Sequence, residues 1–128
     1  MIKVVAALLK KNEKFLIARR KKGKHLEFKW EYPGGKVENN EDEKSALKRE
    51  LKEEFDISSN VGDFITESHY NYEDISINLR LYLIDDFSGD FSLKDHDKIE
   101  WISIKEINNF DFAPADIPIN NYLVKNGL

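Results

Sequence analysis

The sequence predicts an α+β or α/β domain built on a mixed β-sheet. Two observations support this prediction: segments with strand character outnumber those with helical character, and the two kinds follow one another in mixed order. The chain has 128 residues, three prolines and no low-complexity linker, so a single domain over residues 1–128 is expected.

Strands are expected where apolar residues run together or alternate with polar ones. The apolar run at 4–9 is typical of a buried strand, and the alternation at 75–83 is typical of a strand with one buried face. Residues 11–13 are expected to form a turn, 19–24 a basic loop, and 30–36 an ordered turn rich in aromatic residues and glycine. The expected strands are residues 4–9, 15–18, 75–83 and 99–102.

The longest expected helix covers residues 41–55. Asn40 is the predicted N-cap, because Glu43 follows three residues later in the spacing of a capping box. Two further helices are expected, a brief one capped by Ser103 with Glu106, and a last one from Ala115 or Asp116 through Lys125 that stops at Gly127.

Composition excludes several classes of function. The formal net charge is −4 and the sequence pI is about 5.4, which argues against a protein that grips nucleic-acid polymers. The chain has no cysteine, which excludes disulfides, zinc–thiolate sites and a cysteine nucleophile. No segment approaches the roughly 20 apolar residues needed to cross a bilayer, so a cytoplasmic protein without a membrane partner is expected.

Three acidic residues gather on one face of the predicted helix 41–55. At about 100° per residue, Glu50, Glu53 and Glu54 fall within an arc of about 100° beside the apolar stripe. Carboxylates so close together repel one another, and they suit a hard divalent cation, although a merely solvated charged face is the alternative. Upstream, Gly34 and Gly35 let the backbone approach a ligand closely and offer a peptide carbonyl as a further oxygen ligand.

The spacing of these residues resembles the box of the Nudix hydrolases, G-x5-E-x7-R-E-U-x-E-E-x-G-U, where U is aliphatic. The match runs from Gly35 through Glu41 and the Arg-Glu-Leu-Lys-Glu-Glu segment at 49–54 to Ile57. It departs only at the last glycine, which is Asp56 here. Because aspartate tolerates the left-handed conformation, we expect a small stability cost and little effect on chemistry.

The resemblance implies an α/β/α sandwich that uses Mg²⁺, or Mn²⁺, to direct water onto a phosphorus atom. The metal would be held by Glu50, Glu53, Glu54 and the Gly34 carbonyl oxygen, and Arg49 would orient one of these carboxylates. Glu50 is the expected general base, with Asp95 as the alternative; a plain solvated turn is the other interpretation of Asp95.

Nearly the whole chain is also similar to the MutT-type enzymes, whose nucleotide or metal contacts match Arg20, His25, Tyr32, Tyr72, Asp95 and Asp116. This implies hydrolysis of nucleoside triphosphates such as 8-oxo-dGTP to the monophosphate and pyrophosphate. Residues 113–118 are similar instead to the subgroup that includes CTP pyrophosphohydrolase, so CTP or a modified dCTP is the alternative substrate. Two hypotheses assign the chain to classes other than enzymes: a non-catalytic nucleotide sensor and a structural interaction module. A monomer or weak homodimer is expected.

Asp116 is the most informative residue for base specificity. An ionised aspartate only accepts hydrogen bonds, which suits the N4 amine of cytosine, the N6 amine of adenine or the N1 and N2 groups of guanine. A protonated Asp116 also donates, which restores recognition of a purine O6. The alternative interpretation of Asp116 is an N-cap of the last helix.

Overall fold

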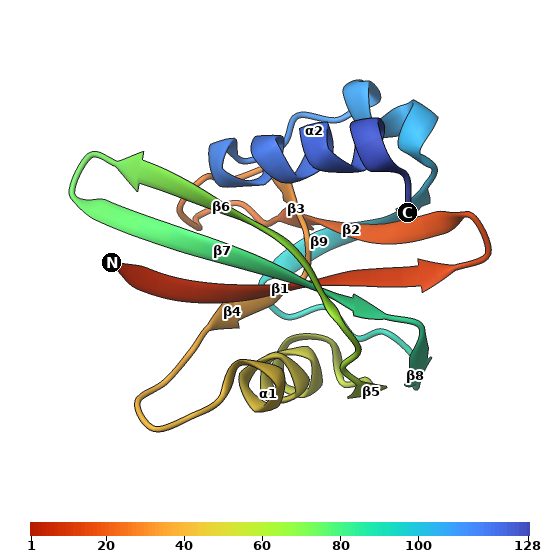
Figure 1. Ribbon diagram of the computed structural model, residues 1–128, viewed down its shortest axis with the longest axis horizontal. Helices are drawn as coiled ribbons and strands as arrows, with labels where there is room; N and C mark the ends of the chain where they lie inside the picture. The colour runs from red at the N-terminus through yellow and green to blue at the C-terminus, as the bar shows by residue number, and fades with distance from the viewer.

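A β-sheet lies between two α-helices in the computed structural model, which describes residues 1–128 (Figure 1). Helix α1 (Glu43–Phe55) covers one face of the sheet and α2 (Ile117–Asn126) covers the other. Two short 3₁₀ helices, η1 (Ile104–Asn109) and η2 (Pro114–Asp116), precede α2. The predicted sandwich of helices around a sheet is therefore confirmed.

Seven strands form the main sheet and two form a small separate pair. The strands are β1 (Ile2–Lys11), β2 (Lys14–Arg20), β3 (Trp30–Glu31), β4 (Gly34–Lys36), β5 (Ser58–Asn60), β6 (Phe64–Tyr72), β7 (Ile75–Ile84), β8 (Asp86–Ser88) and β9 (His96–Ile102). β1 and β7 pair in parallel, whereas β1 with β4, β2 with β9 and β6 with β7 pair antiparallel. The sheet is thus mixed, as the sequence predicts.

The side chains of β1 alternate between two hydrophobic cores, one on each face of the sheet. Ala6 and Leu8 belong to the core beneath α2. The core beneath α1 joins three other β1 residues to the apolar stripe of the helix: Val5, Ala7, Leu9, Leu47, Leu51 and Phe55. Because both faces of β1 are buried, its sequence is a continuous apolar run.

Several strand predictions need correction. β6 was not predicted at all, and residues 30–36 form β3 and β4 in place of a turn. Arg19 and Arg20, expected in a loop, end β2 because Asp97 and Glu31 on neighbouring strands pair with them. β7 is buried on both faces near its centre, where Asn78 is only 8% exposed.

The predicted N-cap of α1 is wrong by two residues. Asp42 caps the helix, since its Oδ1 accepts a hydrogen bond of 2.9 Å from the Ser45 amide. Asn40 lies in the preceding turn with a φ of 64°, and the Glu43 side chain binds Arg80 instead of the helix end. The helix ends as expected, with Asp56 in the left-handed conformation at a φ of 55°.

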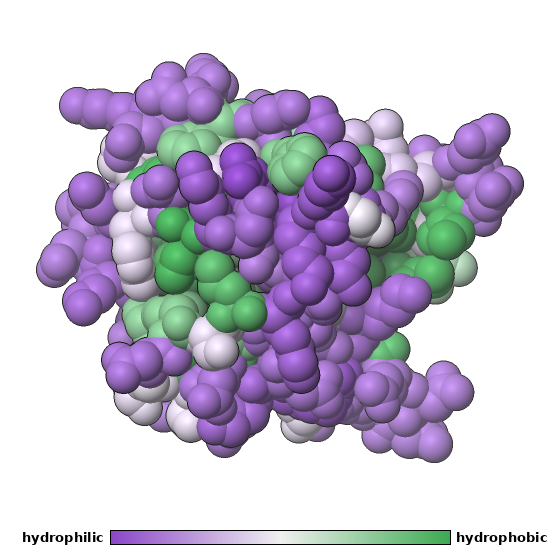
Figure 2. Space-filling view, turned by 180° about the vertical axis from the view of Figure 1, so that it is seen from behind, coloured by the Kyte–Doolittle hydropathy of each residue, from purple (hydrophilic) through white to green (hydrophobic).

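The expectations for the last third of the chain hold with one exception. Ser103 and Glu106 form the predicted capping box, here at the start of η1. Asp116 occupies the N-cap position of α2, as the alternative interpretation expects, but its side chain makes no capping hydrogen bond to the helix. None of the helices is long and apolar enough to span a membrane. Figure 2 shows hydrophilic residues over most of the rear face, with smaller hydrophobic areas between them.

Candidate active site

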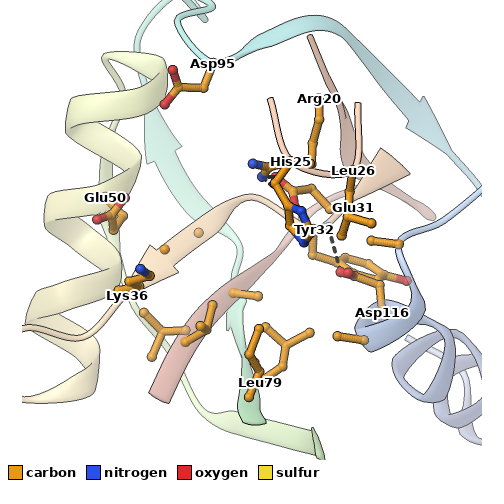
Figure 3. Close-up of a pocket in the computed structure, with 18 of the residues that line it drawn as sticks. Arg20, His25, Leu26, Glu31, Tyr32, Lys36, Glu50, Leu79, Asp95 and Asp116 are labelled. Carbon is orange, nitrogen blue, oxygen red and sulfur yellow. Dashed lines mark hydrogen bonds and ion pairs between the residues drawn. The ribbon is translucent and has the colours of Figure 1, made fainter. Parts of the chain in front are cut away.

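One cavity of about 580 Å³ brings together most of the residues that the sequence singles out. The structure places these predicted residues along its wall: Arg20, His25, Tyr32, Gly34, Glu50, Glu54, Tyr72, Asp95 and Asp116. Arg49 and Glu53 do not line it. Figure 3 shows Glu50 and Asp95 near α1 at one end, and Tyr32 with Asp116 beside α2 at the other. The cavity therefore has an acidic end and a second end that is partly apolar.

At the acidic end, Arg49 orders the surrounding carboxylates. Its guanidinium donates two hydrogen bonds to Glu41, of 2.8 and 2.9 Å, in a bidentate pair. It also donates to Glu50 at 2.9 Å and to Glu53 at 3.2 Å. The bonds from Arg49 lower the pKa of Glu41 to about 2, so Glu41 remains ionised. Arg49 thus contacts two of the predicted metal ligands, while its bidentate pair is with Glu41.

Glu54 and Asp95 face each other, and their proximity shifts their pKa values in opposite directions. Burial, followed by the hydrogen bond with Asp95, raises the pKa of Glu54 to about 7. The same bond, together with Lys24 at 3.0 Å, lowers the pKa of Asp95. The Oε2 atom of Glu54 is buried without a hydrogen-bond partner. Such an unpartnered carboxyl oxygen is suited to a cation or a water molecule.

The two glycines of β4 allow two different close approaches. A Cβ atom on Gly34 would lie 1.9 Å from the Val5 carbonyl oxygen, so only glycine lets β4 pair with β1 here. A Cβ atom on Gly35 would lie 2.2 Å from the Glu50 carboxylate, which rests directly on the strand.

The ladder leaves the Gly34 carbonyl oxygen available. Ala7 donates to the Pro33 carbonyl and Val37 donates to the Lys3 carbonyl, so Pro33 and Val37 form hydrogen bonds with β1. Because only every second residue does so in an antiparallel pair, Gly34 does not. Carbonyls two residues apart on a strand point the same way, and the Lys36 carbonyl accepts from Arg49 at 3.1 Å. The Gly34 carbonyl therefore points away from β1 and toward the side occupied by α1.

These oxygen donors fit a hard divalent cation such as Mg²⁺ or Mn²⁺. Glu50, Glu54 and the Gly34 carbonyl line the cavity, whereas Glu53 is 53% exposed at its margin. The carboxylates do not converge on one point in the structure, since two of them bind Arg49 and the third faces Asp95. Holding a cation would require the side chains to turn from these partners.

At the other end of the cavity, Asp116 is buried, and its surroundings favour the neutral form of its carboxyl group. Burial, then the nearby charge of Glu31, raises its pKa well above the ordinary value. Its Oδ1 accepts a hydrogen bond of 3.1 Å from the Tyr32 amide. A neutral carboxyl group can donate one hydrogen bond and accept others, unlike the ionised form.

The tyrosines take different positions. The Tyr32 ring is buried in the core, where it is stacked against Phe15 and Phe112. Tyr72 is half-buried at the rim, where its ring meets the edge of His25 at 5.7 Å. Tyr72 and His25 are thus the aromatic pair available to a planar ligand.

Glu31 and His96 line the cavity but were not predicted from the sequence. Glu31 pairs with Arg20 at 3.1 Å and with His96 at 2.7 Å. The available signals were slight: Glu31 lies in the aromatic and glycine-rich segment already singled out, and His96 directly follows Asp95. Their contacts join strands that are distant in the sequence, which no local pattern reveals.

Comparisons with known proteins agree with this geometry. A family model for the NUDIX domain matches residues 1–123. The chain is 36% identical over 119 residues to CTP pyrophosphohydrolase of Escherichia coli (strain K12), covering 93% of this chain and 88% of that protein. It is 32% identical over 115 residues to 8-oxo-dGTP diphosphatase of the same strain, covering 90% and 89%.

A solved structure shares the fold of this chain. The solution structure of the E. coli ORF135 protein has a TM-score of 0.87 and 34% identity, covering 98% of this chain and 89% of that one. The box carboxylates are all present, and the matched relatives are named as diphosphatases or pyrophosphohydrolases. The chain belongs to the NUDIX domain family, and it is a Nudix hydrolase.

Proposed function

We propose that this Nudix hydrolase converts nucleoside triphosphates to the monophosphate and pyrophosphate, with an oxidised purine nucleotide such as 8-oxo-dGTP as its substrate. The observation that carries the proposal is the buried carboxyl group of Asp116 on the cavity wall, where burial raises its pKa and so favours the neutral form. A neutral carboxyl donates to a purine O6 and accepts from the adjacent N1–H group, so it matches that edge with two hydrogen bonds.

CTP or a modified dCTP is the second candidate substrate. It is favoured by the 36% identity to CTP pyrophosphohydrolase. The chemistry is compatible, because a neutral carboxyl donates to the cytosine N3 atom and accepts from its N4 amine. The two candidates share the reaction at the phosphates and differ only in the base that Asp116 contacts.

At the acidic end, we assign Glu50, Glu53, Glu54 and the Gly34 carbonyl oxygen to a Mg²⁺ or Mn²⁺ site. When bound, the cation neutralises phosphate charge and acidifies water. Burial raises the pKa of Glu50, whereas Lys24 and Glu54 lower that of Asp95. Since the more basic carboxylate removes a proton from water more readily, these opposite shifts favour Glu50 over Asp95 as the general base.

The affinity for Mg²⁺ is expected to depend on pH through Glu54. Its carboxyl, with a pKa of about 7, must lose a proton before it can bind a cation. Below that pH, affinity should fall by up to about tenfold per pH unit, and above it affinity should level off. Calorimetric titration with Mg²⁺ at pH 6 and pH 8 measures this, with Glu54→Gln as the control that removes the dependence. Equal dissociation constants at the two pH values would contradict the assignment.

A panel of nucleotides at equal low concentration with Mg²⁺ tests the substrate. It should contain 8-oxo-dGTP, dGTP, CTP, dCTP, 5-methyl-dCTP, 2-hydroxy-dATP and ADP-ribose, with both products identified. We expect the highest kcat/KM for 8-oxo-dGTP and release of pyrophosphate. A preference for the cytosine nucleotides would favour the second candidate substrate, CTP or a modified dCTP. Release of orthophosphate would refute the proposed cleavage position.

Substitutions at Asp116 test how the base is read. If the carboxyl acts in its neutral form, Asp116→Asn retains a donor and should keep kcat/KM for 8-oxo-dGTP within about tenfold. Asp116→Leu removes both functions and should lower kcat/KM by about a hundredfold or more. An asparagine variant as inactive as the leucine variant would show that Asp116 works as an ionised acceptor.

A further inference from the structure

His96 is a buried side chain whose hydrogen bonding is only half complete. Its side chain is 4% exposed, and its Nε2 atom lies 2.7 Å from Oε2 of Glu31. The Nδ1 atom is buried and has no hydrogen-bond partner. With Nδ1 unpartnered, the favoured form of the ring is neutral and carries its hydrogen on Nε2, because any hydrogen on Nδ1 would be buried and unpaired. His96 therefore donates to Glu31.

The Glu31 carboxylate links this histidine to the cavity wall. Arg20 approaches it from the other side, with Nη1 at 3.1 and 3.3 Å from the two carboxylate oxygens. Arg20 also donates through Nε to the backbone carbonyl of His25. The labelled side chains of Arg20, Glu31 and His25 lie together in Figure 3, on the side of the cavity that faces Asp116.

Strand register explains why these groups meet. Glu31 is opposite Ala18 on β2, and Arg20 is opposite His96 on β9 just after a register shift between Arg19 and Arg20. The irregularity changes the direction of the Arg20 side chain at the strand end. Three neighbouring strands thus supply one residue each to the chain of contacts from His96 through Glu31 to Arg20.

The His96 ring also packs against α1, the helix that carries the proposed metal ligands. Its ring is stacked on Phe55, the last residue of α1, with centroids 5.1 Å apart and an interplanar angle of 21°. Phe55 is completely buried, so this contact does not move freely. His96 is thus held at a constant position between α1 and the wall that carries Arg20.

We propose that His96 is a positioning residue for nucleotide binding: it holds the Glu31 carboxylate, and through it the Arg20 guanidinium, in place on the cavity wall. This inference rests on the proposed function, since it takes a nucleotide as the occupant of the cavity. Without His96, the half-buried Glu31 loses one of its two partners, and Arg20 is held less firmly against the ligand. Binding of the nucleotide is affected more than the reaction at phosphorus, because the hydrogen bond of His96 goes to Glu31 and none goes to the box carboxylates or the Gly34 carbonyl.

The test compares His96→Phe, which keeps a ring on Phe55 but removes the donor, with His96→Gln, which restores an N–H at the same reach. His96→Phe should raise KM, and the Kd of the product monophosphate, by about tenfold while kcat stays within about threefold. His96→Gln should remain close to the wild type. The exposed His69→Phe is the matched control and should change none of these values.

An unchanged KM and Kd in His96→Phe, whatever its melting temperature, would overturn the proposal and reduce His96 to a packing role. A fall in kcat alone would overturn it as well. If His96→Phe does not fold, Glu31→Gln must show the same rise in KM and Kd, and a wild-type value there overturns the proposal. If the wild type hydrolyses no nucleotide, the proposed function fails, while the monophosphate Kd still decides the role of His96.

Discussion

Replacing Glu50 by glutamine is expected to lower kcat about a thousandfold while the fold is retained. The side chain is 14% exposed, it accepts a hydrogen bond of 2.9 Å from Arg49, and it rests on Gly35. Glutamine has the same shape, so the packing against β4 survives. What is lost is the negative charge, and with it both the proposed cation ligand and the proposed base.

Glu100→Gln is the matched control, because Glu100 is an exposed residue of β9 that does not line the cavity. The wild type and the two variants are compared by steady-state kinetics with saturating Mg²⁺ and by circular dichroism melts. The two measurements separate an effect on catalysis from an effect on stability. Turnover of Glu50→Gln within tenfold of the wild type would refute the assignment of Glu50. A melting temperature that falls together with turnover would instead assign Glu50 a structural role.

The two adjacent glycines of β4 should give opposite results when each is replaced by alanine. A Cβ atom at Gly34 meets backbone atoms of β1, the Val5 oxygen at 1.9 Å and the Ala6 Cα at 2.8 Å, which cannot yield without breaking strand pairing. We expect Gly34→Ala to cost more than about 3 kcal/mol of folding free energy, or about 10 °C or more in melting temperature.

Gly35→Ala meets a side chain instead, since its Cβ atom would lie 2.2 Å from the Glu50 carboxylate. Glu50 can turn aside, so this variant should melt close to the wild type and lose about a hundredfold in kcat. Gly127→Ala is the control for backbone strain without a steric clash: it has no neighbour within 4 Å but a φ of 82°, so it should lower the melting temperature and leave activity unchanged. Thermal melts and kcat are measured for the three variants. Equal losses of stability in Gly34→Ala and Gly35→Ala would contradict the prediction that only the first disturbs the fold.

Helix α1 was predictable because its signals are local. The stripe of Leu47, Leu51 and Phe55 repeats at helical spacing, and all three side chains are completely buried. The cap was misplaced because Asn40 and Asp42 are both good N-cap residues, and only the backbone decides which one precedes the first turn. Local pattern thus predicts that a helix exists more reliably than where it starts.

The features that were missed depend on contacts across the sheet. β6 carries Ser68, His69 and Asn71 among its residues, and it lacks the apolar alternation that marks a half-buried strand. The link from His96 to Glu31 spans 65 residues, and it arises only because β2 lies between β3 and β9. The raised pKa of Asp116 likewise follows from its burial and from the proximity of Glu31, which the sequence alone does not reveal.

The parallel pairing of β1 with β7 has a consequence during synthesis of the chain. Leu9, near the end of the apolar strand β1, is paired with Ile84, so this partner is translated 75 residues later. At about 5–20 residues per second, the nascent strand remains without that partner for several seconds or more. A chain that stalls before Ile84 emerges from the ribosome exposes a hydrophobic edge that invites aggregation or capture by a chaperone.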